Sequence, residues 1–416
     1  MSEVLEKVKT ANKSKAVISA ASTKEKNEAI ERCAELLVDK QEEIIEQNKL
    51  DLQKLEGRED YSKAFYDRLQ LTPERLQDMA QGLRDIIALP DPVGEVLSMW
   101  RRPNGLQVGR VRVPLGVVGI IYEARPNVTV DVAGLSLKSG NAVILRGSSE
   151  AINSNKALVN ILRQGLKKAG IPEEGLCLIE DTSREAALEL MQQNDYIDVL
   201  IPRGGAGLIK TVVENSTIPV LETGVGNCHT FIDASADVQN AIDIADNAKT
   251  QRPGVCNAME TLLVHKDIAE SVLPGLISRL QEKGVEVRGC PQTQKYGSGV
   301  TPAQEEDWST EYLDFILAIK VVNDFEEAVS HIATYGTSHS EAILTNNYNN
   351  AMQFLSVVDA AAVYVNASTR FTDGFEFGLG AEMGISTQKL HARGPMGLEA
   401  LTSTKYIIYG SGQIRP

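Results

Sequence analysis

Hydrophobic residues recur at helical spacing through the first 90 positions, with charged residues between them. This period of three to four residues predicts amphipathic helices. Ser22 stands before a charged run and is expected to cap a helix, and Thr72 followed by Pro73 predicts another helix start. The residues that carry the spacing most clearly are Val4, Val8, Ala11, Ile30, Cys33, Ala34 and Leu37.

The pattern changes after a turn at residues 89–96. Residues 97–113 alternate around Asn104-Gly105, which is a strong hairpin signal. Short apolar runs then alternate with helical stretches, and this predicts doubly wound parallel sheets. Strands are expected at 116–122, 141–147, 176–181, 198–204, 217–223, 284–289, 315–322, 342–346 and 361–366. Helices are expected at 153–169, 183–192, 236–250, 267–283 and 324–336. Residues 401–414 alternate like an exposed strand.

Length and charge narrow the class of protein. The 416 residues exceed the size of one hydrophobic core, about 250–300 residues, so more than one lobe is expected. Forty-two basic and fifty-six acidic residues give a net charge of −14, which disfavours nucleic acid and anionic membranes as partners. No signal peptide or membrane-spanning run is apparent, so a cytoplasmic protein is expected.

The five cysteines argue against disulfides and against zinc. Their number is odd and they form no CxxC pair or Cys/His cluster, which fits a reducing compartment and predicts no metal site. They stand at positions 33, 177, 228, 256 and 290.

Two residues, Cys256 and Glu222, are candidates for catalytic chemistry. Cys256 follows Pro253-Gly254 in an abrupt turn, where backbone donors could serve a nucleophilic thiolate. Glu222 lies between an apolar run and two glycines, which suits a cleft. Taken alone, Cys256 fits a buried structural thiol better than a nucleophile, and Glu222 fits a helix cap or a solvated turn equally well.

The spacing of Glu222 and Cys256, with their flanks, resembles the aldehyde dehydrogenase superfamily from about residue 95 onward. The resemblance implies that Asn127 stabilises an oxyanion. It places residues 139–151 on the phosphate side of a dinucleotide and Gly204-Gly205 in a turn beside it. It also assigns Glu311 to the nicotinamide ribose.

Departures from the superfamily point to one branch. Arg125-Pro126 replaces an aromatic residue before Asn127, and LETGVGN replaces LELGGK. With residues 322–343, these changes resemble the γ-glutamyl phosphate reductases, also called glutamate-5-semialdehyde dehydrogenases. The matching positions in that segment are His331, Tyr335, Gly336, His339, Ser340 and Glu341.

The resemblance implies an NADPH-dependent reduction of L-glutamyl 5-phosphate to L-glutamate 5-semialdehyde and phosphate, the second step of proline biosynthesis. Cys256 would form a thioester, with Asn127 and the Cys256 N–H holding the oxyanion. No water is activated in this direction, so the catalytic role of Glu222 stays open. It would alternatively orient the cofactor or shield the thioester.

The bound anions need cations and hydroxyl groups. Arg146, Ser148 and Ser149 suit the 2′-phosphate of NADP, although an alignment shifted by one residue would place Glu150 there and favour NAD. For the substrate anions the candidates are Arg125, Arg252, Arg370 and His339. Each of these arginines could instead be an ordinary surface residue, and a lone histidine is more often structural.

The expected fold is therefore an aldehyde-dehydrogenase-like α/β fold with two doubly wound parallel-sheet lobes and a small β oligomerisation arm. Residues 1–96 and 114–228 would bind NADP, and residues 229–395 would carry the nucleophile. Residues 97–113 and 399–416 would form the arm, and this predicts a homodimer or homotetramer.

Transfer of the labile acyl phosphate from glutamate 5-kinase would make that kinase a transient partner, although no local feature indicates it. Two alternatives remain: a non-phosphorylating NAD(P)-dependent aldehyde dehydrogenase, and an inactive homologue that binds nucleotide.

Overall fold

The computed structural model describes residues 2–58, 61 and 63–415. The chain forms two compact units. Unit 1 comprises Met1–Thr223, Gly378–Gly384 and Met396–Pro416, and unit 2 comprises Gly224–Phe377 and Ile385–Pro395. The end residues of the predicted lobe and arm boundaries, 1 and 416, lie outside the described residues. The functional assignment of the predicted lobes stays a prediction.

Unit 1 begins with helices, as the hydrophobic spacing predicts. They are α1 Glu3–Ala20, α2 Thr23–Asp39, α3 Gln41–Leu55, α4 Lys63–Leu69 and α5 Pro73–Ala88. Ser22 and Glu25 form a reciprocal capping box at the start of α2. The Thr72 side chain accepts from the backbone N–H of Arg75, with Pro73 in the first turn of α5. Both predicted helix starts are confirmed.

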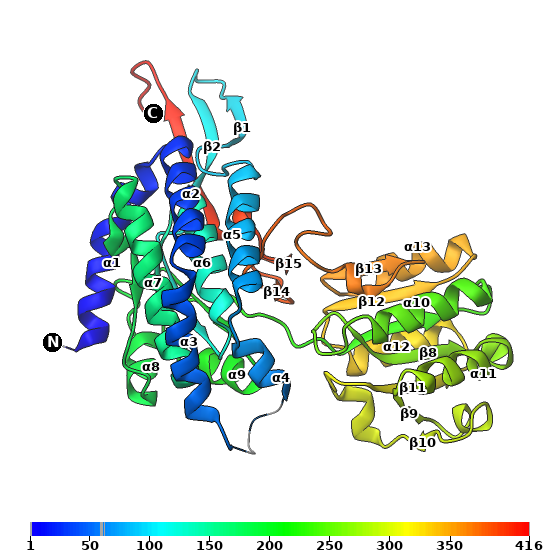
Figure 1. Ribbon diagram of the computed structural model, residues 1–416. Coiled ribbons are helices and arrows are strands. Elements are labelled where there is room, and N and C mark those ends of the chain that lie inside the picture. The colour runs from blue at the N-terminus through cyan, green and yellow to red at the C-terminus, as the bar shows by residue number, and fades with distance from the viewer. Residues whose placement is uncertain (1, 59–60, 62, 416) are drawn as a thin grey trace. The chain divides into compact units, whose positions relative to one another are not determined.

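A four-stranded parallel sheet forms the centre of unit 1, in the order β5-β4-β3-β6. Its strands are β3 Val117–Tyr122, β4 Ala142–Arg146, β5 Leu176–Leu178 and β6 Val199–Arg203. Its helices are α6 Pro126–Lys138, α7 Ile152–Lys168, α8 Arg184–Met191 and α9 Ala206–Asn215. Helix α2 packs on α5, α6 and α7, α5 packs on α6, and α1 contacts β4 and β5 (Figure 1).

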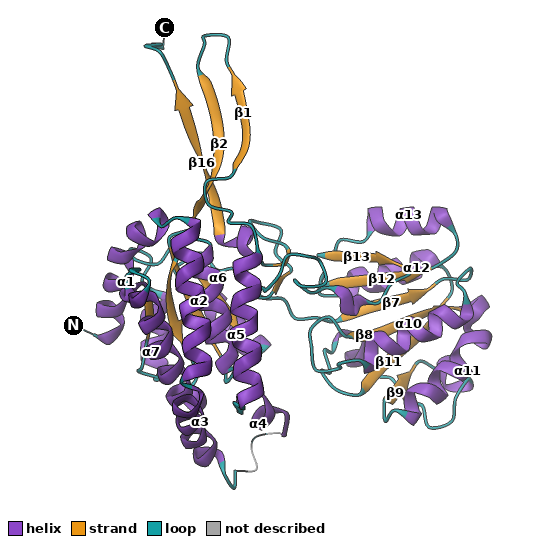
Figure 2. Cartoon of the chain, turned by 45° about the horizontal axis from the view of Figure 1, so that its top comes forward, coloured by secondary structure: helices purple, strands orange, loops and turns teal. Residues whose placement is uncertain are grey.

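The predicted hairpin belongs to a separate antiparallel sheet of unit 1. Strands β1 Val96–Arg101 and β2 Gln107–Pro114 pair across the Asn104-Gly105 turn, where Gly105 has a φ of 90° that favours glycine. The C-terminal strand β16 Thr402–Tyr409 pairs with the other edge of β2 (Figure 2). The predicted association of the hairpin with the end of the chain is confirmed.

Unit 2 contains a seven-stranded parallel sheet in the order β10-β9-β11-β8-β7-β12-β13. Its strands are β7 Cys228–Ile232, β8 Met259–His265, β9 Glu286–Gly289, β10 Thr301–Pro302, β11 Ile316–Val322, β12 Ser340–Leu344 and β13 Ala362–Val365. Its helices are α10 Val238–Thr250, α11 Lys266–Glu282, α12 Phe325–Tyr335 and α13 Tyr348–Val357. A short antiparallel pair, β14 Ile385–Ser386 and β15 Gly394–Pro395, completes it.

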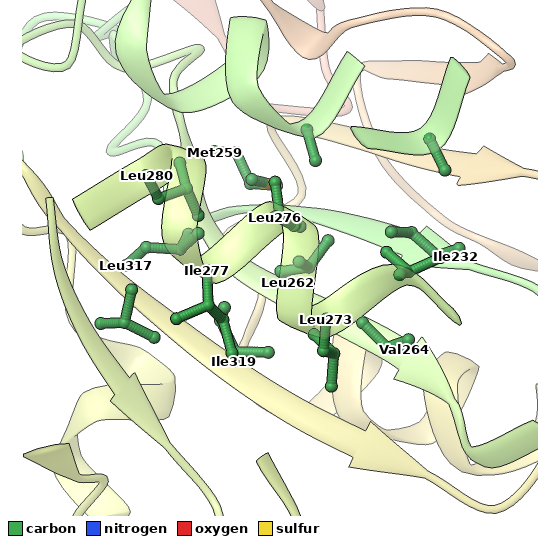
Figure 3. Packing of buried hydrophobic residues seen from close by; sticks show 14 of the residues in the cluster. Ile232, Met259, Leu262, Val264, Leu273, Leu276, Ile277, Leu280, Leu317 and Ile319 are labelled. Atoms are coloured by element: carbon green, nitrogen blue, oxygen red, sulfur yellow. The ribbon is translucent and has the colours of Figure 1, made fainter. Parts of the chain in front are cut away.

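Two hydrophobic clusters cover the two faces of this sheet. Leu262 of β8 packs with Leu276 and Ile277 of α11 (Figure 3). The next residue, Leu263, packs with Phe325 of α12 and Phe354 of α13. Neighbouring residues of a strand point to opposite faces, so the continuous apolar run of β8 supplies both clusters.

One predicted strand is wrong. Residues 217–223 make only an isolated bridge between Val220 and Leu200, and the next strand is β7, which the hydrophobic pattern did not reveal. Strand β7 carries His229 and Thr230 within its buried run, and these polar residues mask it. Helix α6 was likewise not predicted.

Candidate active site

Cys256 lies in the loop that joins α10 to β8 in unit 2, and its side chain is half-buried. The four other cysteines are buried. Burial raises the pKa of the Cys33 thiol to about 12 and that of Cys177 to about 11, and it also raises the pKa of Cys228. Those three thiols therefore stay protonated at neutral pH, whereas the half-buried Cys256 is open to a reagent.

Gly226, just before β7, and Cys228, at its start, restrain the backbone of Cys256. A Cβ atom on Gly226 would overlap the carbonyl oxygen of Cys256, so only glycine fits this close approach. The Cys228 thiol donates to the same carbonyl oxygen at 3.1 Å. The Gly226 N–H donates to Glu311 Oε1 at 2.7 Å, which brings the predicted ribose-binding carboxylate next to the nucleophile loop.

The residue after the nucleophile is tied to the segment that follows β13. Asn257 Nδ2 donates to the carbonyl oxygen of Thr372 at 2.8 Å, and the Thr369 hydroxyl donates to the Asn257 carbonyl oxygen at 2.8 Å. The Cys256 carbonyl group and the residue after it are therefore restrained by two separate segments of unit 2.

Arg370, one of the predicted anion-binding arginines, lies in electrostatic range of both Cys256 and Arg252. Burial, and then the charge of Arg252, lower the pKa of Arg370, whereas a negative charge on Cys256 raises it. Arg370 Nε donates to Gln251 Oε1 at 2.9 Å, and Arg252 is exposed. The structure thus brings Cys256, Arg252 and Arg370 together in unit 2.

His339 is fully buried and contacts the nucleophile loop through Cys228. Its Nδ1 lies 2.8 Å from Ser340 Oγ and 3.7 Å from Cys228 Sγ. Burial lowers the pKa of His339 to about 4, so the ring is neutral at physiological pH. Its predicted role in substrate binding stays a prediction.

Other residues of segment 322–343, which matched the family pattern, form a buried cluster against β7. Glu341 Oε2 lies 3.2 Å from His229 Nδ1, and burial raises the pKa of Glu341. The ring of His331 packs on His229, Trp308 and Tyr335. Burial lowers the pKa of His331 to about 3. The His331 ring is therefore a neutral part of the core of unit 2.

Asn127, Arg125 and Glu222 belong to unit 1. Asn127 is exposed in the first turn of α6, and its Nδ2 donates to Asp131 Oδ2 at 3.2 Å. Burial raises the pKa of Asp131 to about 6. Arg125 and Glu222 are half-buried.

The predicted cofactor residues also lie in unit 1. Arg146 Nη2 donates to the carbonyl oxygens of Thr182 and Ser183 at 2.6 and 3.0 Å. Its Nε is buried and has no hydrogen-bond partner among the described residues. Ser148 and Ser149 follow at the start of a short 3₁₀ turn. An unmet buried donor fits a nearby anion.

Gly204 and Gly205 lie between β6 and α9, at the point where the strand order of this sheet reverses. Dinucleotides bind at such a point in open α/β sheets. A Cβ on Gly204 would stand 2.6 Å from the Glu123 carboxyl carbon, and the Gly205 N–H donates to Glu123 Oε1 at 3.1 Å. The unmet Arg146 donor and this glycine turn together fit a dinucleotide.

Sequence reasoning missed the residues that hold the nucleophile loop. Gly226 and Cys228 had a visible signal, because they lie in the stretch that includes Glu222. Lys249 and Glu260 flank Cys256 in sequence, but nothing local indicates that their side chains meet in a buried ion pair.

Two possible features are not found among the described residues. No group of three or more His, Cys, Asp or Glu side chains could hold a metal ion there. Within the same residues, no helix has the length and apolar character needed to cross a membrane.

Comparisons with known proteins agree with this architecture. The model of the aldehyde dehydrogenase family matches residues 1–310. A γ-glutamyl phosphate reductase of Clostridium botulinum is 61% identical over 417 residues and one of Moorella thermoacetica is 62% identical over 414, with 99% or more of each chain covered. The crystal structure of γ-glutamyl phosphate reductase from Thermotoga maritima is 52% identical, with a TM-score of 0.97 and full coverage of both chains. The chain therefore belongs to the aldehyde dehydrogenase family and, within it, to the γ-glutamyl phosphate reductases.

Proposed function

We propose that this oxidoreductase reduces L-glutamyl 5-phosphate to L-glutamate 5-semialdehyde and phosphate through a thioester on Cys256, with NADPH as the hydride donor. The reaction would be the second step of proline biosynthesis, carried out in the cytoplasm. The observation that supports it most is the half-buried Cys256, whose carbonyl group and following residue are held by hydrogen bonds, with Arg370 in electrostatic range.

The chemistry that follows from these residues begins with the Cys256 thiolate. It attacks the acyl carbon, the bond from carbon to the phosphate oxygen breaks, and phosphate leaves. Arg252 and Arg370 would bind the substrate anions, and their positive charge also favours the thiolate. Asn127 and the Cys256 N–H would stabilise the oxyanion, and loss of one such donor costs about 2.7–4 kcal/mol.

The residues proposed to hold the dinucleotide are Arg146, Ser148, Ser149, Gly204, Gly205 and Glu311. When bound, this group supplies the hydride of the reduction. Arg146 with its unmet Nε would meet the 2′-phosphate of NADP. Glu150 accepts a hydrogen bond from the Tyr61 hydroxyl at 3.1 Å, which supports Ser149 over Glu150 at the ribose. Glu311 would bind the nicotinamide ribose from its place beside Gly226.

Three residues keep less defined roles in the proposal. Arg125 would contribute to binding the substrate anions, and His339 would do so only after its burial is relieved. Glu222 would protect the thioester from water or orient the cofactor. If Glu222 instead activated water, the enzyme would be a non-phosphorylating aldehyde dehydrogenase.

A phosphate-dependence assay tests the proposal. Purified protein is given glutamate semialdehyde and NADP, with and without phosphate or arsenate, and NADPH is recorded. The proposal predicts NADPH formation that requires the anion, in the native protein and not in Cys256→Ser. Turnover to free glutamate without phosphate would establish the non-phosphorylating alternative. Dinucleotide binding with no NADPH formation, with or without the anion, would establish the inactive homologue.

We further propose that the arm of β1, β2 and β16 joins subunits into a homodimer or homotetramer. Strands β1 and β16 are the edges of this sheet, and an exposed edge pairs readily with a neighbour. Its exposed apolar residues would be covered in such an assembly. They include Met99, Trp100, Tyr406, Ile408 and Tyr409.

Removal of residues 399–416 is expected to lower the oligomeric state, because it deletes one edge strand. Light scattering on the native and the shortened protein measures this. An unchanged molecular mass per assembly, with unchanged circular dichroism, would show that the arm is not the contact.

A further inference from the structure

A buried ion pair joins the two ends of the nucleophile loop. Lys249 lies in the last turn of α10 and Glu260 lies at the start of β8, on either side of Cys256. Their Nζ and Oε2 atoms are 2.5 Å apart, and both side chains are fully buried. The pair therefore closes the loop at its base.

The second oxygen of Glu260 reaches a third segment. Glu260 Oε1 accepts the backbone N–H of Leu313 at 3.1 Å. Leu313 has a φ of 53°, in the left-handed region that a branched non-glycine side chain rarely adopts. Such a conformation persists only where the surrounding structure holds it, and the bond to Glu260 is one such restraint.

The Leu313 segment is also the one that carries Glu311. The Glu311 carboxylate accepts the N–H of Gly226, whose Cα packs against the Cys256 carbonyl group. The carbonyl oxygen of Leu313 lies 3.6 Å from where a Cβ on Gly254 would stand. The segment 311–313 therefore approaches the nucleophile loop at Gly254, binds Gly226 beside that loop, and reaches the base of the loop through Glu260.

Stability alone does not account for burying two opposite charges here. Replacing a buried ion pair by apolar residues of similar volume is often neutral or stabilising, so such a pair is weak evidence for a structural role. Burial raises the pKa of Glu260 and lowers that of Lys249, as expected when both charged forms lose their hydration. The structural effect of the pair is to join α10, β8 and the segment that carries Glu311 at one point.

We propose that Lys249 and Glu260 are positioning residues. They hold Leu313 so that the Glu311 carboxylate and the Cys256 loop keep a fixed position relative to each other. The inference rests on the proposed function, because it takes Glu311 as a dinucleotide-binding residue and Cys256 as the nucleophile. Lys249 fixes Glu260, and Glu260 fixes the segment that bears Glu311.

Two double variants of similar size test this. K249M/E260M removes the charges and the acceptor for Leu313. K249Q/E260Q removes the charges but can keep the connection. In that variant the amide oxygen of the new side chain at position 260 can accept from Leu313, and its amide N–H can donate to the new side chain at position 249. The measurements are the melting temperature, the alkylation rate of Cys256 by iodoacetamide, and kcat and KM for the dinucleotide.

The expected result separates folding from positioning. K249M/E260M melts at or above the native temperature but loses about 100-fold in kcat/KM for the dinucleotide, and its Cys256 alkylation rate changes. K249Q/E260Q keeps kcat/KM for the dinucleotide and the alkylation rate of Cys256 within about threefold of the native values, because the connection to Leu313 is retained. Native kinetics in K249M/E260M, or equal losses in both variants, would overturn the proposal.

Glu260→Asp decides the question if K249M/E260M does not fold. Its carboxylate keeps the charge beside Lys249, but it is one methylene too short to reach Leu313 as well. It is expected to fold and to lose kcat/KM, whereas native values of kcat/KM and alkylation would contradict the proposal. The alkylation rate needs no substrate, so a failure of positioning can be distinguished from a failure of the proposed reaction.

The matched control is the Lys26–Asp91 pair of unit 1, in which the lysine is likewise fully buried. K26M/D91N is expected to change the melting temperature and to leave the alkylation rate of Cys256 and both kinetic constants of the folded protein at native values. A change in alkylation as large as that of K249M/E260M would show that any loss of a buried pair disturbs Cys256, and this would also overturn the proposal.

Discussion

Among the residues that the structure describes, each unit of the molecule contains one ion pair at 2.5 Å between a fully buried lysine and a carboxylate. In unit 1, Lys26 pairs with Asp91, and in unit 2 Lys249 pairs with Glu260. The lysines are 1% and 0% exposed. The carboxylates are 9% and 0% exposed, and the larger difference lies in what each pair holds, so distance alone does not separate a structural pair from a functional one.

The partners of Lys26 and Asp91 are elements of the scaffold. Lys26 Nζ also donates to the carbonyl oxygen of Lys138, and Asp91 accepts from the Thr23 hydroxyl and the Val93 N–H. The pair thus ties α2 to the end of α6 and to the turn before the arm. Glu260, in contrast, holds a strained loop residue beside the nucleophile.

The two carboxyl groups also differ in their protonation. Burial of Asp91 would raise its pKa, but hydrogen bonds from Lys26, Thr23 and Val93 outweigh it, and the pKa is lowered. Burial dominates at Glu260 and raises its pKa to about 7. Asp91 therefore adds stability that is lost as the pH falls through its lowered pKa. Glu260 adds stability that is lost as the pH rises through about 7.

The largest expected effect comes from the backbone contact on the nucleophile loop in unit 2. Gly226→Ala forces a methyl group against the Cys256 carbonyl and is expected to lower kcat/KM by about 100-fold or more. The control is Gly82→Ala in α5 of unit 1, where a Cβ meets nothing within 4 Å and helix propensity favours alanine. Steady-state kinetics on both variants measures the difference, and similar values for the two would refute the role of Gly226.

A smaller effect is expected from breaking the pair of unit 1. Lys26→Met leaves the half-buried Asp91 without its cation and is expected to cost up to about 3 kcal/mol of unfolding free energy, the lower end of what breaking a fully buried pair costs. Urea denaturation measures this loss. The activity of the folded fraction should stay native, because the partners of Lys26 belong to the scaffold. A fall in kcat at unchanged stability would mean that the Lys26–Asp91 pair also positions active-site residues, like the pair of unit 2.

The smallest expected effect is a pH dependence carried by a buried histidine of unit 2. Burial lowers the pKa of His339 to about 4, so the unfolded state binds the extra proton first as the pH falls. The contribution of His339 to stability is then full above about pH 6.5 and lost below it, on the order of 2 kcal/mol by about pH 4.5. Urea midpoints of the native protein and of His339→Gln across this pH range measure the loss. An equally steep loss in the variant would assign the effect to other groups.

The sequence allows the local features to be predicted, and the reason is visible in particular residues. Asn104-Gly105 and Thr72-Pro73 act within a few positions, so their turn and helix start follow from local geometry. The strand expected at 217–223 failed, because strand pairing depends on distant partners: residues 217–223 form one bridge, and the sheet of unit 2 starts at Cys228.

The candidate site divides in the same way. Cys256 and Glu311 follow from motifs in the sequence. The contact between Gly226 and Cys256 and the bond from Glu260 to Leu313 join residues that are 30 and 53 positions apart, and no periodicity encodes them. His339 matches the family pattern, but its complete burial became visible only in the fold.

The most direct test of the central claim, a thioester on Cys256, is to trap it. Protein incubated with glutamate semialdehyde and NADP without phosphate should accumulate an acyl-enzyme, which digestion and mass spectrometry can locate. One glutamyl adduct is expected on the Cys256 peptide, discharged by phosphate with formation of the acyl phosphate, and none is expected in Cys256→Ser. An adduct on another residue, or native reductase activity in Cys256→Ser, would contradict it.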